Sequence, residues 1–106
     1  MAEMKELTNE NYKESLEGKN SILFIYKEGD PLNIPIERGM TASAKQLNAQ
    51  MALFKMLFES NPEAMETLSV TGTPTLIVSK EGNIVWRKTG MPAPSDAAEI
   101  DALFLS

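Results

Sequence analysis

The fold is decided by the stretch Val70-Thr71-Gly72-Thr73-Pro74-Thr75-Leu76-Ile77-Val78. Residues 75–79 form an apolar, partly β-branched run that predicts a strand, and residues 83–87 form a second run of the same kind. The turn residues Lys80-Glu81-Gly82 lie between the two runs. This order predicts a β-hairpin that the chain enters through a proline turn.

Upstream of the hairpin, residues 21–26 are apolar without interruption, which is typical of a strand buried on both faces of a sheet. Residues 27–39 are predicted to be irregular, because Gly and Pro interrupt them repeatedly. Capping and breaking residues predict three helices: residues 9–17 with Thr8 or Asn9 as N-cap, residues 63–68 after Asn61-Pro62, and residues 96–105 with Ser95 as N-cap.

Residues 40–60 allow two interpretations. Neither Gly nor Pro occurs in them, so helix propensity alone predicts one helix. Residues 52–58 are nevertheless apolar on every side, as in a buried parallel strand. We prefer a helix to about Asn48 followed by a strand. The alternative is a single helix through the whole stretch.

The composition excludes several classes of function. The 106 residues are enough for a single domain, residues 1–106, and its net charge of −5 argues against a nucleic-acid partner. Cys and His are both absent, so the chain has no thiolate, no disulfide, no Cys or His metal ligand and no imidazole base. We therefore expect no cofactor, no metal site and no catalytic residue.

The segment from Val70 to Gly90 resembles the C-terminal half of the thioredoxin superfamily. Pro74 corresponds to the cis-proline of that family, and Gly90 to the glycine that ends its last strand. The resemblance implies an α/β, thioredoxin-like fold with a central mixed sheet and helices on both faces. Four segments are also similar to the catalytic domain of periplasmic disulfide isomerases: residues 41–45, 61–62, 72–74 and 90–94. This second resemblance implies one helix over residues 41–60 and an extra strand at residues 32–36.

The redox motif of the family, Cys-x-x-Cys, is replaced here by Pro31-Leu32-Asn33-Ile34. Dithiol exchange needs one thiolate that attacks and a second thiol that resolves the mixed disulfide, so we expect no thiol oxidoreductase activity. The family's buried carboxylate corresponds to Ile25, and its lysine partner to Lys55.

A preserved scaffold without its redox chemistry suggests a binding protein. The resemblance implies a protein or extended peptide bound at the cis-proline face, as in cysteine-less chaperones or adaptors of the superfamily. Two alternatives stay open: a disulfide isomerase relative that lacks its cysteines, or a clock-protein-like fold that forms homo-oligomers. The predicted binding residues are Leu32, Asn33, Ile34, Gly72, Thr73, Pro74, Gly90 and Met91. Trp86, on the predicted second strand of the hairpin, is the competing interface.

No segment predicts membrane insertion or secretion. The longest apolar run covers residues 22–26, and the charged N-terminus lacks an apolar signal core. We expect a soluble bacterial protein of the cytoplasm, or of the periplasm if a signal peptide has been removed.

Overall fold

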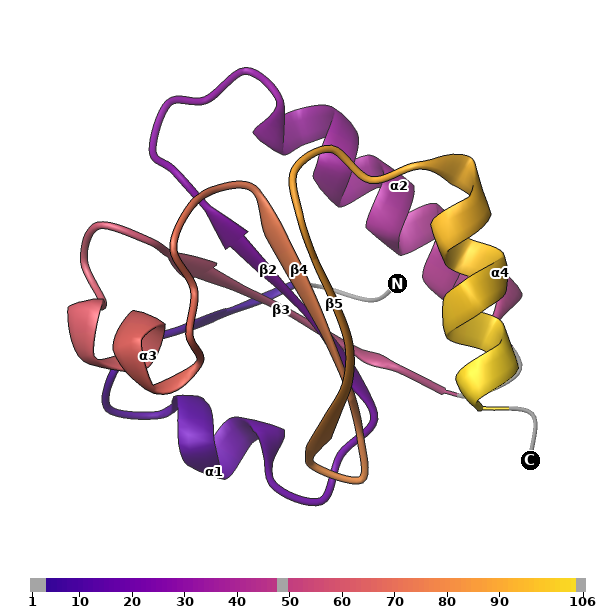
Figure 1. The fold of residues 1–106 in the computed structure, drawn as a ribbon, viewed down its shortest axis with the longest axis horizontal. Helices are drawn as coiled ribbons and strands as arrows, with labels where there is room; N and C mark the ends of the chain where they lie inside the picture. The colour runs from indigo at the N-terminus through magenta and orange to yellow at the C-terminus, as the bar shows by residue number, and fades with distance from the viewer. Residues whose placement is uncertain (1–3, 48–49, 105–106) are drawn as a thin grey trace.

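The centre of the molecule is a five-stranded mixed sheet with the strand order β1-β3-β2-β4-β5 (Figure 1). The computed structural model describes residues 4–47 and 50–104. Within them the strands are β1 (Lys5–Leu7), β2 (Ser21–Tyr26), β3 (Ala52–Leu57), β4 (Thr75–Lys80) and β5 (Asn83–Thr89). The helices are α1 (Tyr12–Leu16), α2 (Asn33–Gln46), α3 (Pro62–Thr67) and α4 (Pro94–Leu103).

The register of the sheet confirms the predicted hairpin and the predicted central strand. β4 and β5 pair antiparallel across the turn, and β4 also pairs antiparallel with β2, with Leu23 opposite Ile77. β2 and β1 both run parallel to β3. Every residue of β2 except Tyr26 is buried, because helices cover both faces of the sheet.

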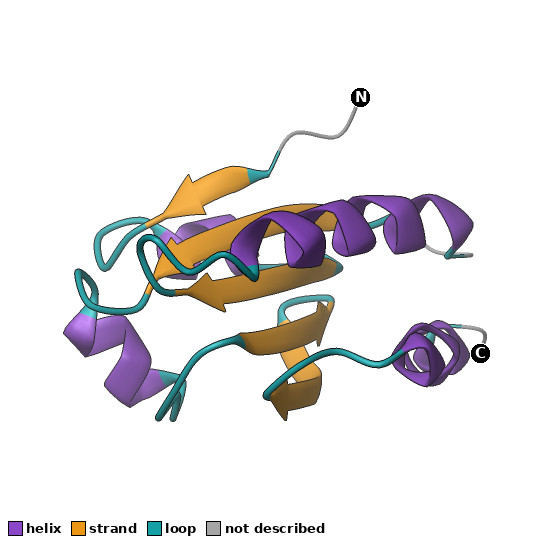
Figure 2. Cartoon of the chain, turned by 90° about the horizontal axis from the view of Figure 1, so that it is seen from above, coloured by secondary structure: helices purple, strands orange, loops and turns teal. Residues whose placement is uncertain are grey.

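Helices α1 and α3 lie on one face of the sheet, and α2 and α4 lie on the other (Figures 1 and 2). Alternate side chains of each strand enter opposite layers, as the period of two requires. Leu23 and Ile25 pack into the α1/α3 layer, whereas Ile22 and Phe24 pack into the α2/α4 layer. The sheet therefore separates two hydrophobic clusters.

The structure confirms a helix followed by a strand between residues 40 and 60. α2 ends at Gln46 and β3 begins at Ala52, while Asn48 lies outside the described residues. The alternative of one helix over residues 41–60 with an extra strand at residues 32–36 is wrong.

The predicted irregular segment is wrong from Asn33 onward, because α2 begins there. Pro35 is the third residue of the helix, where a backbone N–H has no intrahelical partner to lose. Gly39 lies in the middle of the helix with an ordinary negative φ. Pro and Gly often interrupt helices, but at these two positions of α2 neither residue does.

Two helix starts also differ from the prediction. α1 begins at Tyr12, because the Asn11 side chain accepts the Thr8 N–H and the preceding residues form a turn. α4 begins at Pro94 with Ala93 as N-cap, since the Asp96 carboxylate, and not Ser95, accepts the Ala93 N–H at 2.7 Å.

Strand β1 was not predicted, because in it only Leu7 is buried and the other two residues are charged. Leu105, the predicted end of the last helix, lies outside the described residues. Across the described ranges, no helix combines the length and the hydropathy that crossing a membrane would need.

Candidate functional site

The predicted binding residues come from three segments at one end of the sheet: the start of α2, the turn before β4 and the loop after β5 (Figure 1). We call this set the Pro74 surface: Leu32, Asn33, Ile34, Gly72, Thr73, Pro74, Gly90 and Met91. The peptide bond between Thr73 and Pro74 is cis, and the Pro74 carbonyl accepts the Gly90 N–H at 2.8 Å. The proline turn and the loop after β5 are thus in direct contact.

The start of α2 is held in place by hydrogen bonds within its own loop. The Asp30 carboxylate accepts the Leu32 N–H at 2.9 Å, and the Asn33 side-chain amide donates to the Lys27 carbonyl at 2.8 Å. These bonds fix the backbone of the loop. The Ile34 side chain is 61% exposed. Leu32 is also exposed, so the loop presents two apolar side chains from a fixed backbone.

A side-chain hydrogen bond fixes the turn before β4. Thr75 is fully buried, and its hydroxyl donates to the Gly72 carbonyl at 2.7 Å. Within residues 4–47 and 50–104, the backbone N–H and C=O of Thr73 take part in no hydrogen bond. Thr73 itself is half-buried.

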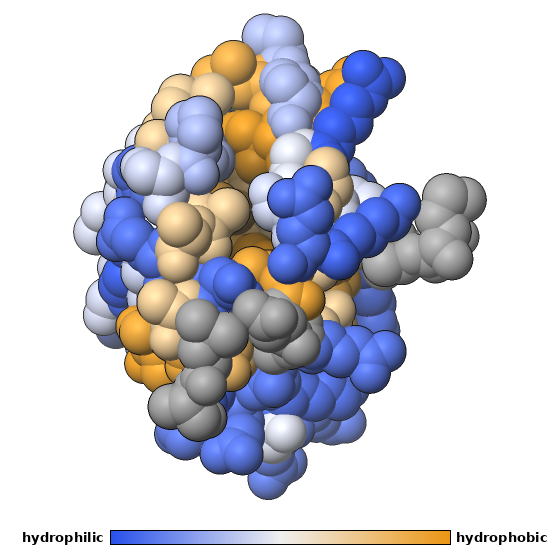
Figure 3. Space-filling view, turned by 90° about the vertical axis from the view of Figure 1, so that its right-hand side faces the viewer, coloured by the Kyte–Doolittle hydropathy of each residue, from blue (hydrophilic) through white to orange (hydrophobic). Residues whose placement is uncertain are grey.

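A groove separates α2 from α4 and has a volume of about 290 Å³ (Figure 3). Met91 lies at the edge of the Pro74 surface and also lines this groove. The walls include three small residues that sequence reasoning missed: Gly39, Ser43 and Ala97. Gly39 and Ser43 are four residues apart on one flank of α2, a spacing that could have revealed them.

A partly buried ion pair lies at the start of α4, with the Lys88 side chain 34% exposed. The Asp96 carboxylate accepts the Ala93 N–H and also pairs with Lys88 at 3.0 Å. The hydrogen bond from Ala93, supported by Lys88 and opposed by burial, holds the pKa of Asp96 below its usual range. The Asp96 carboxylate therefore stays ionised, with the Ala93 N–H and Lys88 as its partners.

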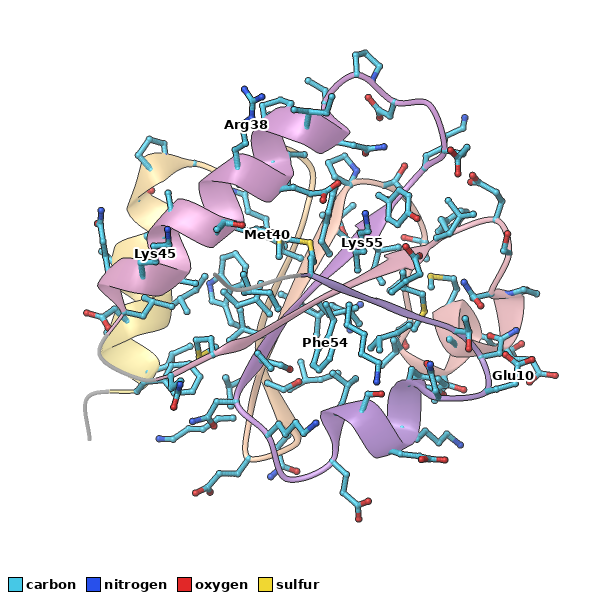
Figure 4. The ribbon with its side chains drawn as sticks, turned by 180° about the vertical axis from the view of Figure 1, so that it is seen from behind. Glu10, Arg38, Met40, Lys45, Phe54 and Lys55 are labelled. Atoms are coloured by element: carbon cyan, nitrogen blue, oxygen red, sulfur yellow. The ribbon has the colours of Figure 1, made fainter. Side chains whose placement is uncertain are left out.

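Lys55 forms an ion pair with a residue of α2. Ile25, at the position of the family's buried carboxylate, is apolar and fully buried. Lys55 instead pairs with Glu37 of α2 at 3.5 Å and lies over the Tyr26 ring, 5.6 Å from its centroid (Figure 4). The Tyr26 hydroxyl donates to the Glu6 carboxylate at 2.9 Å, and burial together with this carboxylate raises the pKa of Tyr26.

None of these groups forms a catalytic arrangement. The positions of the redox motif hold Pro31, Leu32, Asn33 and Ile34, and the sequence has no cysteine. In the described part of the chain, no group of three or more acidic side chains is placed to hold a metal ion. In the described residues, the Pro74 surface combines exposed apolar side chains with a Thr73 backbone that forms no hydrogen bond.

Comparison with known proteins defines the fold. No family model matches the chain, and no curated protein matches it in sequence. Among solved structures, it is similar to a designed protein, with a TM-score of 0.83 and 17% identity over 95% of this chain and 97% of that one. It is also similar to thioredoxin f2 of Chlamydomonas reinhardtii, with a TM-score of 0.79 and 15% identity over 95% and 96% of the two chains. The five-stranded mixed sheet, the helices on both of its faces and these matches together show that the chain has a thioredoxin-like fold.

Proposed function

We propose that this protein is a non-catalytic, adaptor-like or chaperone-like binder of an extended protein segment at the Pro74 surface. The observation that supports it best is that three exposed apolar side chains, Leu32, Ile34 and Met91, lie at the same end of the sheet as the unused backbone of Thr73 (Figure 1). In the described residues these are three of the five large apolar side chains that are exposed. Such a concentration at one end of the sheet is typical of an interaction site.

The mode of binding follows from the free backbone groups of Thr73. An extended segment can donate to and accept from them as an added strand, while its side chains contact the surrounding apolar residues. The backbone hydrogen bonds depend little on sequence, so selectivity comes from the side chains. The Pro74 surface therefore suits a partner that is locally unfolded.

The charge of the surroundings favours neutral or basic segments. Glu28 and Asp30 lie in the loop before α2, and Glu59 reaches this loop by accepting the Glu28 N–H at 2.9 Å. The chain as a whole carries a net charge of −5. Association with a basic segment is then accelerated by attraction and slowed by added salt.

A second candidate function is self-association through the edge strand β5. It is favoured by Ile84 and Val85, which are 44% and 39% exposed. The outer edge of β5 is open in the sheet order, and open edges pair readily with other strands. Trp86 of the same strand is half-buried.

One binding experiment with matched variants separates the two candidates. The probe is a fluorescently labelled unfolded protein, reduced and alkylated so that it cannot fold, and its binding is followed by anisotropy. Ile34→Asp is expected to weaken binding at least about tenfold, because it places a charge in the apolar contact. Ile84→Asp is the matched control, because it puts the same charge on the β5 edge.

Thr73→Arg tests the backbone contact and should abolish probe binding while leaving the melting temperature nearly unchanged. Unchanged affinity in Ile34→Asp and Thr73→Arg, with loss in Ile84→Asp or Trp86→Ala, would place the interface on β5. An unfolded probe that does not bind the wild-type chain at micromolar concentration would contradict the proposal.

A further inference from the structure

The groove between α2 and α4 opens directly beside the Pro74 surface. The hydrogen bond from the Gly90 N–H to the Pro74 carbonyl joins the proline turn to the loop after β5. Met91, the next residue of that loop, lines the groove and is 51% exposed. A segment bound at Thr73 would therefore lie next to the opening of the groove.

The floor of the groove is apolar. Ile36, Met40, Leu76 and Ile100 line it, and each is at most 6% exposed. The volume of about 290 Å³ is enough for one large side chain but lies just below the range of sites for drug-sized ligands. In size and chemistry the groove fits an apolar side chain, aliphatic or aromatic.

Among the described residues, Asp96 is the one charged residue that lines the groove. Its carboxylate is engaged by Lys88 and by the Ala93 N–H. A charged side chain that entered the groove would lose its hydration and gain no partner. The electrostatics thus match an uncharged occupant.

Gly39 lies on the α2 side of the groove and has no side chain to fill it. A glycine in the middle of a helix is less favourable than alanine, and the φ of Gly39 does not require it. A Cβ atom built at Gly39 would meet nothing within 4 Å, so no close approach requires it either. Its missing side chain instead adds to the open volume.

We infer that the groove between α2 and α4 takes one large, uncharged apolar side chain of the extended segment bound at the Pro74 surface. This inference rests on the proposed function, because the Pro74 surface must hold the backbone of the same segment. The continuity through Met91 and the neutral apolar lining support this occupant. The site would thus select segments with an aliphatic or aromatic residue beside the part paired with Thr73.

The test uses the full chain and host–guest peptides of the form acetyl-Thr-Lys-Thr-X-Thr-Lys-Thr-amide, with Ala, Leu or Trp at X. Affinities are measured by titration of ¹⁵N-labelled protein. The Leu and Trp peptides should bind about tenfold more tightly than the Ala peptide, since burial of a large apolar side chain contributes at least that much.

Matched variants on α4 assign this selectivity to the groove. Ala97→Leu fills the groove and should reduce the affinity ratio between the Trp and Ala peptides to about one. Ala98→Leu adds the same side chain at an exposed neighbouring position that does not line the groove, and should keep the ratio. The melting temperatures of both variants confirm that they are folded.

The outcomes separate this inference from the proposed function. Equal binding of all three peptides, still lost in Thr73→Arg, would overturn the groove assignment and leave the proposed function standing. Selectivity that survives Ala97→Leu would overturn the assignment as well. A wild-type chain that is dimeric by light scattering and becomes monomeric in Ala97→Leu would show that a second copy occupies the groove, and would also overturn it. Absence of binding by every peptide and by the unfolded probe would contradict both proposals.

Discussion

Each face of the sheet has a hollow, and the two hollows differ in their lining. The groove between α2 and α4 has a volume of about 290 Å³ and an apolar floor. The hollow between α1 and the β4–β5 hairpin has a volume of about 470 Å³, and Lys13, Glu14 and Glu17 form part of its lining. The lining of a hollow, and not its volume alone, therefore decides whether an apolar side chain fits it.

The α1/α3 layer is held together by large side chains and by cross-links. It contains buried residues such as Met65 and Leu68. Its connections are fixed by two asparagines: the Asn61 side chain accepts the Asn9 N–H at 3.0 Å, and the Asn9 side chain accepts the Ala64 N–H at 2.9 Å. The α2/α4 layer has a buried hydrophobic cluster of its own, but small residues lie along its groove. Both faces thus contribute to stability, and the α2/α4 face also has an apolar groove for a ligand.

The largest expected effect comes from opening a cavity in the α1/α3 layer. Leu23 is fully buried in it, and Leu23→Ala should lower the free energy of unfolding by about 3 kcal/mol. Leu32→Ala, at an exposed position of the Pro74 surface, should change it by less than about 1 kcal/mol. Urea denaturation measures both, and equal losses would contradict the difference in burial between Leu23 and Leu32.

Loss of a cross-link comes next. Asn61→Ala removes the acceptor of the Asn9 N–H and the donor to the Leu57 carbonyl, both at a site only 5% exposed. The expected loss is about 2 kcal/mol, because two partners are left without hydrogen bonds. If chemical denaturation shows a change below about 0.5 kcal/mol, the asparagine pair does not stabilise this layer.

A smaller and pH-dependent effect is expected at the start of α4. Asp96→Asn keeps an acceptor for the Ala93 N–H but loses the charge, so stability at pH 7 should fall by about 1 kcal/mol. The pKa of Asp96 is lower in the folded state, so its contribution is complete above the unfolded pKa, near 4, and is lost as pH falls through the folded pKa. Denaturation curves from pH 7 to pH 2 should therefore converge for the two proteins at acid pH. A constant difference would rule out this role of the charge.

The smallest change stabilises the protein. Gly39→Ala should raise the free energy of unfolding by about 0.7 kcal/mol, because alanine is the better helix former and its Cβ meets nothing within 4 Å. Thermal denaturation should show the midpoint rising by a few degrees. A loss of stability would mean that the groove wall at Gly39 is closed in solution.

The sequence carried more information about the sheet than about its edges and the groove. β2, β3 and β4 could be predicted because short apolar runs are typical of buried strands, and β5 followed from the turn residues before it although most of its side chains are exposed. β1 has one buried residue, and its place depends on pairing with β3, which no local pattern reveals. The start of α2 was missed because Pro35 signals a break unless the helix boundary is already known.

For the candidate site, the sequence indicated the residues around Pro74 but not the groove. The three segments of the Pro74 surface were recognised from the proline turn and its resemblance to a known superfamily. The groove depends on the distance between two helices that are far apart in sequence. Ser43 and Ala97 are ordinary helix residues until that distance is known.

The most direct test of the account is to map the binding of the unfolded probe onto the amides of the ¹⁵N-labelled chain. We predict that amide chemical shifts change at residues 32–34, 72–73, 90–91 and 93, and in the groove at Gly39, Ser43 and Ala97. Residues 83–86 of β5 should remain unaffected. Shift changes confined to residues 83–86, with residues 72–73 unaffected, would contradict the claim that this fold binds extended segments at its proline turn.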